Sequence, residues 1–453
     1  MSSLFPRLVV PDDRLALRID GDSWSYRDLA GAASAHADAI CAAGVPSEGR
    51  VAVWAYPTLT TAAAVLGNMA AGAVTVLLSP KLGEGELAHI LRDAAPYLAF
   101  GDASAPPPRS VAALRTVTAQ YPGGLAASST VEVDDTPALI LYTSGTTGAP
   151  KGAVITRRNI ATNLDALASV WEWTERDTVV HALPLIHVHG LVLGLFGSLR
   201  VGGALHHVPR FAPDAIAAAL GESTHDRTML FAVPTMIHRL ADAAEVDTKI
   251  ADALRSPRLL ISGSAGLPVR EHERIRAITG RGVHERYGLT ETLINCAIPA
   301  SDPPAPGYVG PALPGVELKL VDDLRVPIQA RDDETIGEVA VRSDSVFAGY
   351  LNRDDATAAV LDEAGWFYTG DLATRRQDGS IRVLGRRSTD LIKTGGYRVG
   401  AGEIEACLLE HPACVEVAVV GVPDEDLGQR IVAFVVIRPG SDSVDAPSLD
   451  DFV

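Results

Sequence analysis

Apolar segments of strand length alternate with amphipathic helical segments through the first hundred residues. Residues 50–54 and 73–78 are short apolar runs of the kind that form buried strands. Apolar residues recur at helical spacing in residues 26–43, 60–71 and 84–94. Ser25 is the expected N-cap of the first of these helices. The alternation is typical of a largely parallel sheet with helices on its faces, so we expect an α/β fold.

The pattern continues along the chain and then changes. Further strands are expected at residues 179–183, 229–233, 258–262 and 283–286. Each ends in a polar turn, and open α/β sheets bind ligands at the carboxyl ends of their strands. After Pro304 the sequence consists of short strands and turns, at residues 317–321, 337–342, 365–368 and 381–384. These predict a smaller β subdomain.

The strand and helix pattern restarts at Asp390, with a helix expected at residues 402–410 and strands at 415–421 and 431–437. We therefore expect a large N-terminal domain of helix-covered sheets and a β subdomain, and a smaller α+β C-terminal domain. The expected limits are residues 1–385 for the N-terminal domain, 386–390 for a hinge and 391–453 for the C-terminal domain. Residues 440–453 are polar, so the C-terminal domain is expected to be incomplete.

The composition argues against nucleic acid and membrane partners and is consistent with a cytoplasmic location. The 39 basic and 56 acidic residues give a net charge of −17, which argues against nucleic acid or an anionic membrane as a partner. The four cysteines form no CxxC pair, as is usual for reduced cytosolic thiols. No signal peptide and no apolar run of about 20 residues is evident. A cytoplasmic protein is expected, and its oligomeric state is left open.

The sequence YTSGTTGAPKG at residues 142–152 carries the sharpest chemical signal. It follows an apolar strand at residues 138–141. Glycines and small hydroxyl residues let a backbone wrap a polyanion and donate to it, and Lys151 adds a positive charge. The spacing differs from that of a Walker A loop. The motif predicts a phosphate-binding turn.

This string resembles the signature of the acyl-adenylate-forming superfamily, which includes the acyl-CoA synthetases. Four other segments match in the expected order: ERYGLTET at 285–292, YTGD at 368–371, Gly385-Arg386, and 392–405 with IKTGGYRV and EIE. The resemblance covers nearly the whole chain. It implies an acid–thiol ligase that uses ATP, Mg²⁺ and coenzyme A, with a C-terminal domain that moves about the hinge.

The resemblance also implies roles for single residues. Tyr287 would stack on adenine, Asp371 would accept the ribose hydroxyls, and Arg386 would reach the ribose or phosphate. Thr290, Glu291 and Lys151 are the expected catalytic residues, with Thr290 on the α-phosphate and Glu291 as the Mg²⁺ ligand. The other residues assigned to the nucleotide and CoA are Thr143, Ser144, Gly145, Thr146, Thr147, Gly148, Gly263, Ser264, Ala265, Glu285, Arg286, Gly288 and Lys393.

Two positions in the matching pattern are left open. The resemblance implies a lysine near the C-terminus that bridges acid and ATP, but the last lysine here is Lys393. Either the sequence stops before that lysine, which we favour, or the protein lacks it. We expect Lys393 to lie near the adenylate or the pantetheine. The hinge has one residue more than the usual spacing, so its pivot is Ser388, Thr389 or Asp390.

The acid is predicted from His187, His189, Arg239 and Ser262. The segments PLIHVHG and VPTMIHR resemble the malonyl-CoA synthetase branch, in which such an arginine binds the distal carboxylate. The planar fork of a guanidinium pairs with a carboxylate through two hydrogen bonds. The predicted acid is therefore malonate, a small dicarboxylic acid, with methylmalonate possible. The alternatives are a short- or medium-chain fatty acyl-CoA synthetase, a carrier-protein loader, and a non-catalytic nucleotide-binding protein.

Overall fold

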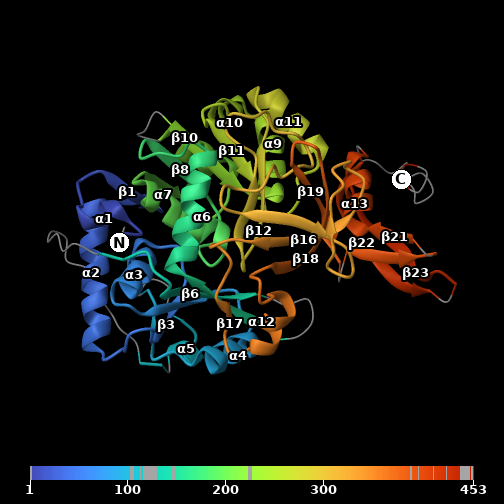
Figure 1. Ribbon diagram of the computed structural model, residues 1–453. Helices are drawn as coiled ribbons and strands as arrows, with labels where there is room; N and C mark the ends of the chain where they lie inside the picture. The colour runs from blue at the N-terminus through green and yellow to red at the C-terminus, as the bar shows by residue number, and fades with distance from the viewer. Residues whose placement is uncertain are drawn as a thin grey trace.

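The computed structural model describes residues 3–102, 107–112, 114–115, 130–143, 149–222, 227–387, 390–395, 397–411, 413–424, 426–438, 449 and 452. Two large sheets with helices on their faces form the N-terminal part, and a smaller sheet extends beyond it at the C-terminal end (Figure 1). Of two short helices, α1 (Pro6–Val9) precedes the first strand of the chain and α5 (Arg109–Ala112) lies between two strands of one sheet in sequence.

A six-stranded sheet has the order β17-β7-β6-β4-β3-β5. Its strands are β3 (Arg50–Trp54), β4 (Val74–Leu78), β5 (Leu98–Phe100), β6 (Pro137–Thr143), β7 (Lys151–Thr156) and β17 (Gly349–Tyr350). The strands β3 to β6 are parallel, whereas β6 and β7 form an antiparallel hairpin. The predicted phosphate-binding turn therefore connects the two strands of this hairpin.

The helices α2 (Tyr26–Ala42), α3 (Leu59–Ala70) and α4 (Glu84–Ala94) accompany this sheet in sequence. The predicted N-cap of α2 is confirmed. The Ser25 hydroxyl accepts from the Asp28 amide, and the Asp28 carboxylate accepts from the Ser25 amide. This reciprocal pair satisfies two amide groups that the first helical turn leaves unpaired.

An eight-stranded sheet has the order β13-β12-β11-β10-β8-β9-β1-β2. Its strands are β1 (Leu15–Ile19), β2 (Asp22–Ser25), β8 (Asp177–His181), β9 (Ala204–His207), β10 (Arg227–Ala232), β11 (Leu259–Ser262), β12 (His284–Leu289) and β13 (Leu293–Ala297). The strands β8, β10, β11 and β12 are parallel neighbours, so their carboxyl ends lie at one edge. The helix α6 (Arg157–Val170) precedes β8 in sequence. The helical segments between β8 and β12 are the π-helix η1 (His189–Gly197), α7 (Ser198–Val201), α8 (Pro213–Gly221), α9 (Pro234–Val246), α10 (Thr248–Leu254) and α11 (Val269–Thr279).

The strand expected at residues 179–183 begins and ends two residues earlier, at Asp177 and His181. The difference comes from Asp177, which is fully buried and accepts from the side chains of Arg227 and Arg258. A buried carboxylate is stable only with such partners, and those partners lie about 50 and 80 residues away in the sequence. A local pattern of apolar residues cannot predict this pairing.

The predicted β subdomain is an antiparallel five-stranded sheet. Its strands are β14 (Glu317–Val321), β15 (Pro327–Ile328), β16 (Gly337–Arg342), β18 (Phe367–Arg375) and β19 (Ile381–Arg386), with α12 (Asp354–Val360) between β17 and β18. A separate four-stranded sheet follows, with β20 (Leu391–Thr394), β21 (Tyr397–Gly400), β22 (Cys414–Asp424) and β23 (Gly428–Ile437). The helix α13 (Ala401–Glu410) packs on β22 and β23 around a small core. The predicted fold class is confirmed, and the domain limits remain a prediction.

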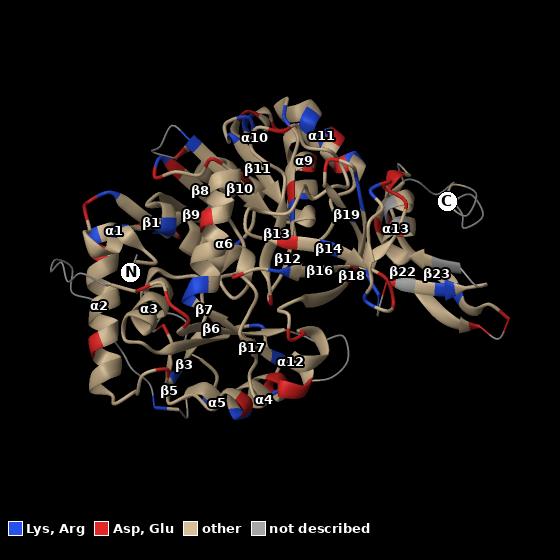
Figure 2. Cartoon of the chain, in the orientation of Figure 1, with Lys and Arg blue, Asp and Glu red and all other residues tan. Residues whose placement is uncertain are grey.

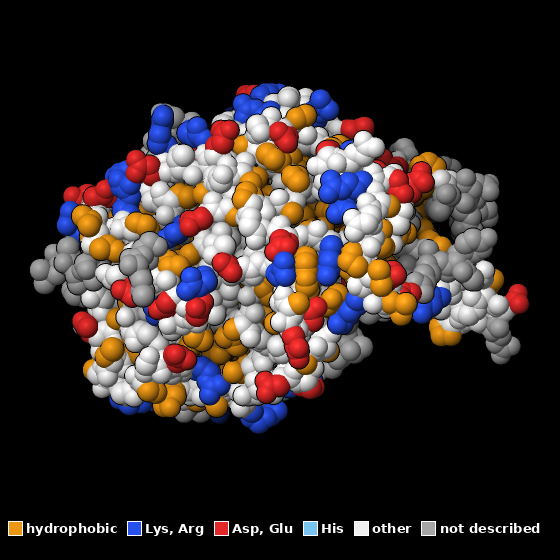
Figure 3. All heavy atoms as spheres, in the orientation of Figure 1, with side chains coloured by type: hydrophobic (Ala, Val, Ile, Leu, Met, Phe, Trp, Pro, Cys, Tyr) orange, Lys and Arg blue, Asp and Glu red, His pale blue; other side chains and the backbone are white. Residues whose placement is uncertain are grey.

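Charged residues of both signs are distributed over the helices and loops (Figure 2). Basic and acidic side chains are interspersed on the face shown in Figure 3, which has no extended area of one sign. An anionic ligand on this face would therefore have to be bound by a few local groups. Among the described residues, no helix combines the length and apolar character needed to span a bilayer.

Candidate active site

The two stems of the β6–β7 hairpin bring the ends of the predicted phosphate-binding turn together. Thr143, the last residue of β6, pairs with Lys151, the first residue of β7. Ser144, Gly145, Thr146, Thr147 and Gly148 lie outside the described residues. The structure thus places both stems of the turn at the end of the sheet next to β17.

Tyr350 connects two of the predicted catalytic residues. Its hydroxyl donates to Glu291 Oε1 over 2.7 Å, and Lys151 Nζ lies 4.4 Å from the centroid of its ring. Burial, followed by the nearby Glu291 carboxylate, raises the pKa of Tyr350 above its usual range, so the hydroxyl keeps its proton and remains a donor. Sequence reasoning missed Tyr350. Its position depends on the pairing of β17 with β7, which joins residues about 200 positions apart.

Tyr287, Asp371 and Arg386 form a second connected group. The Tyr287 hydroxyl donates to Asp371 Oδ2 over 2.6 Å, and Arg386 Nε lies 2.9 Å from Asp371 Oδ1. Burial raises the pKa of Asp371, although the Arg386 cation and the Tyr287 hydroxyl act in the opposite direction. The structure therefore brings together the residues predicted for adenine, ribose and the hinge.

The chain between these groups is a tight turn. Thr290 is half-buried in the turn from β12 to β13, directly before Glu291. Gly288 lies at a β-bulge, and a Cβ on it would lie 1.8 Å from the Leu293 carbonyl oxygen. Only glycine fits there, because any side chain would collide with backbone. Gly288 therefore shapes the turn that carries Thr290 and Glu291.

Glu285 holds the loop that follows β11. Its Oε1 lies 2.9 Å from His272 Nε2 and its Oε2 accepts from the Leu267 amide, with Glu285 and His272 both almost fully buried. Glu285 thereby fixes the loop after β11, which contains Gly263, Ser264 and Ala265. Sequence reasoning assigned Glu285 to the nucleotide and missed His272. Both carboxylate oxygens have a partner within the protein, and the assignment of Glu285 to the nucleotide stays a prediction.

The loop after β11 is strained where it meets Arg286. Ser264 has a φ of 75°, an uncommon conformation for a residue with a Cβ. A Cβ on Gly263 would lie 2.6 Å from Arg286 Cζ, so the missing side chain makes room for the guanidinium. Strain of this kind persists where the surrounding structure fixes the backbone, as it does at binding sites.

Arg286 is a buried cation without an anionic partner. It is 6 % exposed, and it forms no ion pair with any carboxylate in the part of the chain that the structure describes. Its contact with a side chain is a 3.4 Å hydrogen bond from Nη2 to Ser264 Oγ, and its Nε has no partner among the described residues. Burial lowers the pKa of Arg286 to about 10, which still leaves it charged at neutral pH.

Two further polar groups lack partners among the described residues, one at the end of β11 and one at the start of η1. Ser262, at the end of β11, is fully buried, and its Oγ has no partner within the described ranges. His189 is 5 % exposed and stacks on Phe231 of β10, and neither ring nitrogen has a described partner. The Arg286 charge is near enough to add to the lowering of the His189 pKa by burial. The site therefore offers a cation without an anionic partner, and a hydroxyl and an imidazole without partners, among the described residues.

The remaining predicted residues, Arg239, His187 and Lys393, are exposed. Arg239 is exposed on α9 and has no hydrogen bond or ion pair with any described residue, and His187 is also exposed. Lys393 is exposed on β20, where its amide donates to Gln429 Oε1. The structure does not bring Lys393 into contact with the other predicted site residues that it describes.

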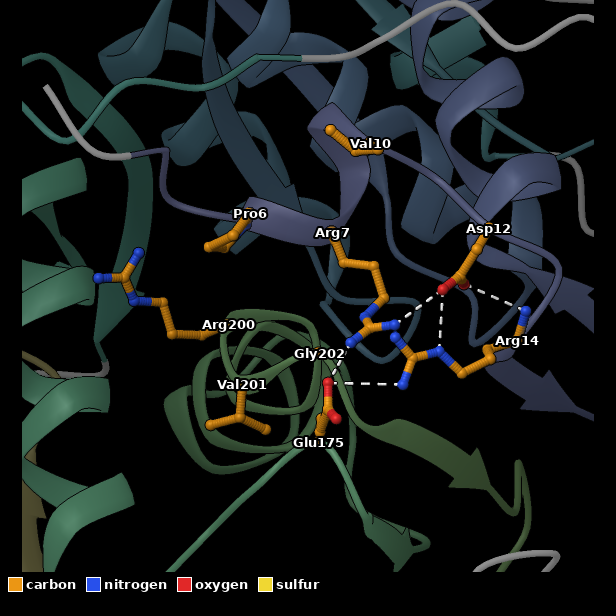
Figure 4. A pocket seen from close by; sticks show the side chains of 9 residues that line it. All are labelled: Pro6, Arg7, Val10, Asp12, Arg14, Glu175, Arg200, Val201 and Gly202. Carbon is orange, nitrogen blue, oxygen red and sulfur yellow. Dashed lines mark hydrogen bonds and ion pairs between the residues drawn. The ribbon is translucent and has the colours of Figure 1, made fainter.

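A hollow of about 450 Å³ near the N-terminus is separate from these groups (Figure 4). Arg7 and Arg14 in this hollow are both paired with Asp12 and Glu175. Arg200 at its edge points away and pairs with Asp165. Because these cations are already neutralised, the hollow is a poor candidate for an anion site.

Buried neutral histidines make the folded chain sensitive to acid. Burial lowers the pKa of His36 to about 4 and that of His207 to about 3, and it lowers the pKa values of His181 and His189 well below the usual range. Protons therefore bind these groups more readily in the unfolded chain. Stability should fall as the pH drops below about 6.5, by at most ~1.4 kcal/mol per histidine and pH unit.

Melting temperatures measured from pH 7.5 to 5.0 test this expectation. The wild type should melt at a progressively lower temperature below pH 6.5, and His207→Asn should show a shallower decline because one titrating group is removed. Equal slopes for the two chains, or a flat profile, would contradict the expectation.

The comparisons with known proteins give the family. Residues 8–351 match the model of the AMP-binding enzyme, and residues 403–453 match that of the AMP-binding enzyme C-terminal domain. The chain belongs to the AMP-binding enzyme family. The resemblance drawn from the motifs is confirmed.

Among the individual relatives of this chain are malonate–CoA and malonyl-CoA ligases. The malonate–CoA ligase of Arabidopsis thaliana is 34 % identical to this chain, and the match covers 94 % of this chain and 76 % of that protein. A malonyl-CoA ligase solved as a ternary product complex with methylmalonyl-CoA and AMP is 50 % identical, with a TM-score of 0.78 and coverage of 99 % and 95 %. The ATP-bound MatB from Rhodopseudomonas palustris is 33 % identical, with a TM-score of 0.90 and coverage of 99 % and 91 %.

Proposed function

We propose that this chain is an AMP-forming acid–CoA ligase that converts malonate, and small 2-substituted malonates such as methylmalonate, to the CoA thioester. The observation that carries the proposal is Arg286, a buried guanidinium without a carboxylate partner among the described residues. The malonate–CoA ligases and the methylmalonyl-CoA complex among its relatives support the same acid.

A substrate carboxylate would supply the partner that Arg286 lacks. An unpaired buried charge is costly, whereas a buried charge that meets a hydrogen-bonded anion is stabilised. Ser262 and neutral His189 would each donate one further hydrogen bond, because a hydroxyl and one imidazole nitrogen carry a proton at neutral pH. A dicarboxylic acid held by its distal carboxylate leaves the other carboxylate free to react. Exposed Arg239 on the neighbouring helix α9 remains a second candidate for this contact.

In the first step the free carboxylate attacks the α-phosphorus of ATP, an oxygen–phosphorus bond forms, and pyrophosphate leaves. Catalysis of such a displacement depends on alignment and on neutralising charge. Lys151 would bind the β- and γ-phosphates, which leave as pyrophosphate, and Thr290 would donate to the α-phosphate. Asp371, with its position fixed by Tyr287 and Arg386, would accept from the ribose hydroxyls.

Glu291 is the proposed ligand for Mg²⁺, and its surroundings fit that role. Magnesium is usually bound by one or two carboxylates with phosphate and water oxygens completing an octahedron. Glu291 supplies one buried carboxylate, and Tyr350 fixes its orientation. The ion would reduce the negative charge on the phosphates.

In the second step the CoA thiolate attacks the carbonyl carbon of the malonyl-adenylate. A carbon–sulfur bond forms, the mixed anhydride bond breaks, and AMP leaves with the bonding electron pair. We place Lys393 in this second step, near the adenylate or pantetheine, because its one described hydrogen bond is to Gln429 and it contacts none of the described residues assigned to the first step.

Mass spectrometry of the products tests the proposal. The chain would be incubated with ATP, Mg²⁺, CoA and, separately, malonate, methylmalonate, acetate or octanoate. Malonyl-CoA as the main thioester, formed together with AMP and pyrophosphate, is expected. A main product of acetyl-CoA or octanoyl-CoA would refute the acid, and ADP with phosphate would refute the reaction.

A further inference from the structure

The helix α4 contacts both sides of the phosphate-binding hairpin, although it lies about 50 residues upstream of it. On one stem, the Tyr142 hydroxyl donates to Asp93 Oδ2 over 2.7 Å. Directly before the other stem, which begins at Lys151, His89 Nε2 lies 2.9 Å from the Pro150 carbonyl oxygen. Because that oxygen can only accept, His89 must carry its proton on Nε2.

His89 and Asp93 are four residues apart, so they share one face of the helix. The apolar face of α4 is anchored beside them, because Leu87, Ile90 and Ala94 belong to the same buried cluster as Ile140 of β6. Tyr142, Val154 and Leu351 pack against that cluster. The helix therefore has a fixed position on the sheet, and its two polar contacts have a fixed geometry.

The contact at Tyr142 depends on the glycine that ends the motif. Gly152 is directly opposite Tyr142 in the hairpin. A Cβ on Gly152 would lie 2.8 Å from Ile140 Cγ2 and 3.0 Å from Tyr142 Cζ. The absence of a side chain at Gly152 thus leaves the Tyr142 ring space to lie across the stem and reach Asp93.

A third contact extends the arrangement to the strand that carries Tyr350. Asn352, two residues after Tyr350, donates through Nδ2 to the Asp93 carbonyl oxygen over 2.9 Å and to Asp93 Oδ1 over 3.2 Å. The Leu351 amide donates to the Gly152 carbonyl oxygen. Asp93 therefore links one stem of the hairpin to the strand whose tyrosine contacts both Lys151 and Glu291.

We propose that His89 and Asp93 are positioning residues for ATP, which fix the two stems of the β6–β7 hairpin and, through Asn352, the strand β17. The inference rests on the proposed function only in that the hairpin binds the phosphates of ATP. It does not depend on which acid is the substrate. Loss of either contact should weaken ATP binding and leave the acid site unchanged.

Calorimetric titration of the full chain with ATP and Mg²⁺, without acid or CoA, tests the proposal. Asp93→Ala, His89→Ala and Tyr142→Phe should each weaken ATP binding by about tenfold, the usual effect of losing a partly buried hydrogen bond. Asp93→Asn and His89→Gln should bind nearly as the wild type, because each retains an atom able to make the contact. Glu86→Ala is the matched control, an exposed residue of the same helix without described contacts.

Steady-state kinetics separate positioning from general damage to the fold. The KM for ATP should rise in the alanine variants, whereas the KM for malonate and the melting temperature should stay close to those of the wild type. Asp93→Ala combined with Tyr142→Phe should be no worse than Asp93→Ala alone, since Asp93→Ala already removes the contact with Tyr142. Unchanged ATP affinity in Tyr142→Phe and Asp93→Ala would overturn the proposal, as would equal losses for ATP and malonate. A wild type that binds ATP but makes no malonyl-CoA would refute the proposed acid alone.

Discussion

Replacing Arg286 with methionine is expected to lower kcat/KM for malonate by roughly 100- to 1,000-fold, the loss that follows truncation of one partner in a buried charge pair. The same change should affect acetate much less, because acetate has no distal carboxylate to pair with Arg286. The measurement is thioester formation with each acid under identical ATP and CoA concentrations.

The same variant carries a second expectation about stability. In the free protein Arg286 is a buried charge without a described anionic partner, and an apolar side chain of similar volume removes that cost. Arg286→Met should therefore melt at a higher temperature than the wild type while losing its use of malonate. Malonate should raise the melting temperature of the wild type and not that of the variant.

Arg239→Met is the matched control for Arg286. Arg239 is exposed on α9 and its side chain contacts no described partner, so the change should have a smaller effect on malonate than the change at Arg286. If Arg239→Met instead lost more activity with malonate than Arg286→Met, Arg239 would be the residue that binds the distal carboxylate, as the sequence motif predicts. Equal losses for malonate and acetate at both positions would exclude either arginine from this contact.

Glu291→Gln should lower the rate of malonate-dependent ATP–pyrophosphate exchange by roughly 100- to 1,000-fold, since it removes the negative charge proposed to hold Mg²⁺ beside the phosphates. Tyr350→Phe should lower that rate by about 10- to 100-fold, the usual effect of losing a group that orients a metal ligand. The exchange reports the first step alone.

Two controls make this result specific. Glu363→Gln removes the same charge from an exposed position without described contacts, and it should exchange as the wild type does. Supplied with preformed malonyl-adenylate and CoA, Glu291→Gln should still form the thioester, because the metal is assigned to the first step. A variant that fails equally with the adenylate would contradict that assignment.

The sequence predicted those elements that are encoded locally. The helix at residues 84–94 and the strand at residues 50–54 have the predicted limits, and α2 begins at the predicted cap. Such elements depend on apolar spacing and capping within a few residues. The family resemblance assigned Tyr287, Asp371 and Arg386 to one nucleotide, and the structure joins their side chains.

The contacts that orient the site could not be predicted, because they join distant parts of the chain. Tyr350 reaches Glu291 through the pairing of β17 with β7, and His272 reaches Glu285 across α11 and β12. The difference in exposure between Arg239 and Arg286 could not be predicted for the same reason. Their exposure depends on whether the helix α9 or the strand β12 carries them, and the sequence gives no measure of burial for a lone arginine.

The most direct test of the central claim is the kcat/KM ratio of the wild type for malonate over malonamate, in which a neutral amide replaces the distal carboxylate at almost the same size. If a buried guanidinium pairs with that carboxylate, malonate should be preferred by about 100-fold or more. A ratio near one would contradict the claim, because it would mean that the site recognises the shape of the acid and not its second charge.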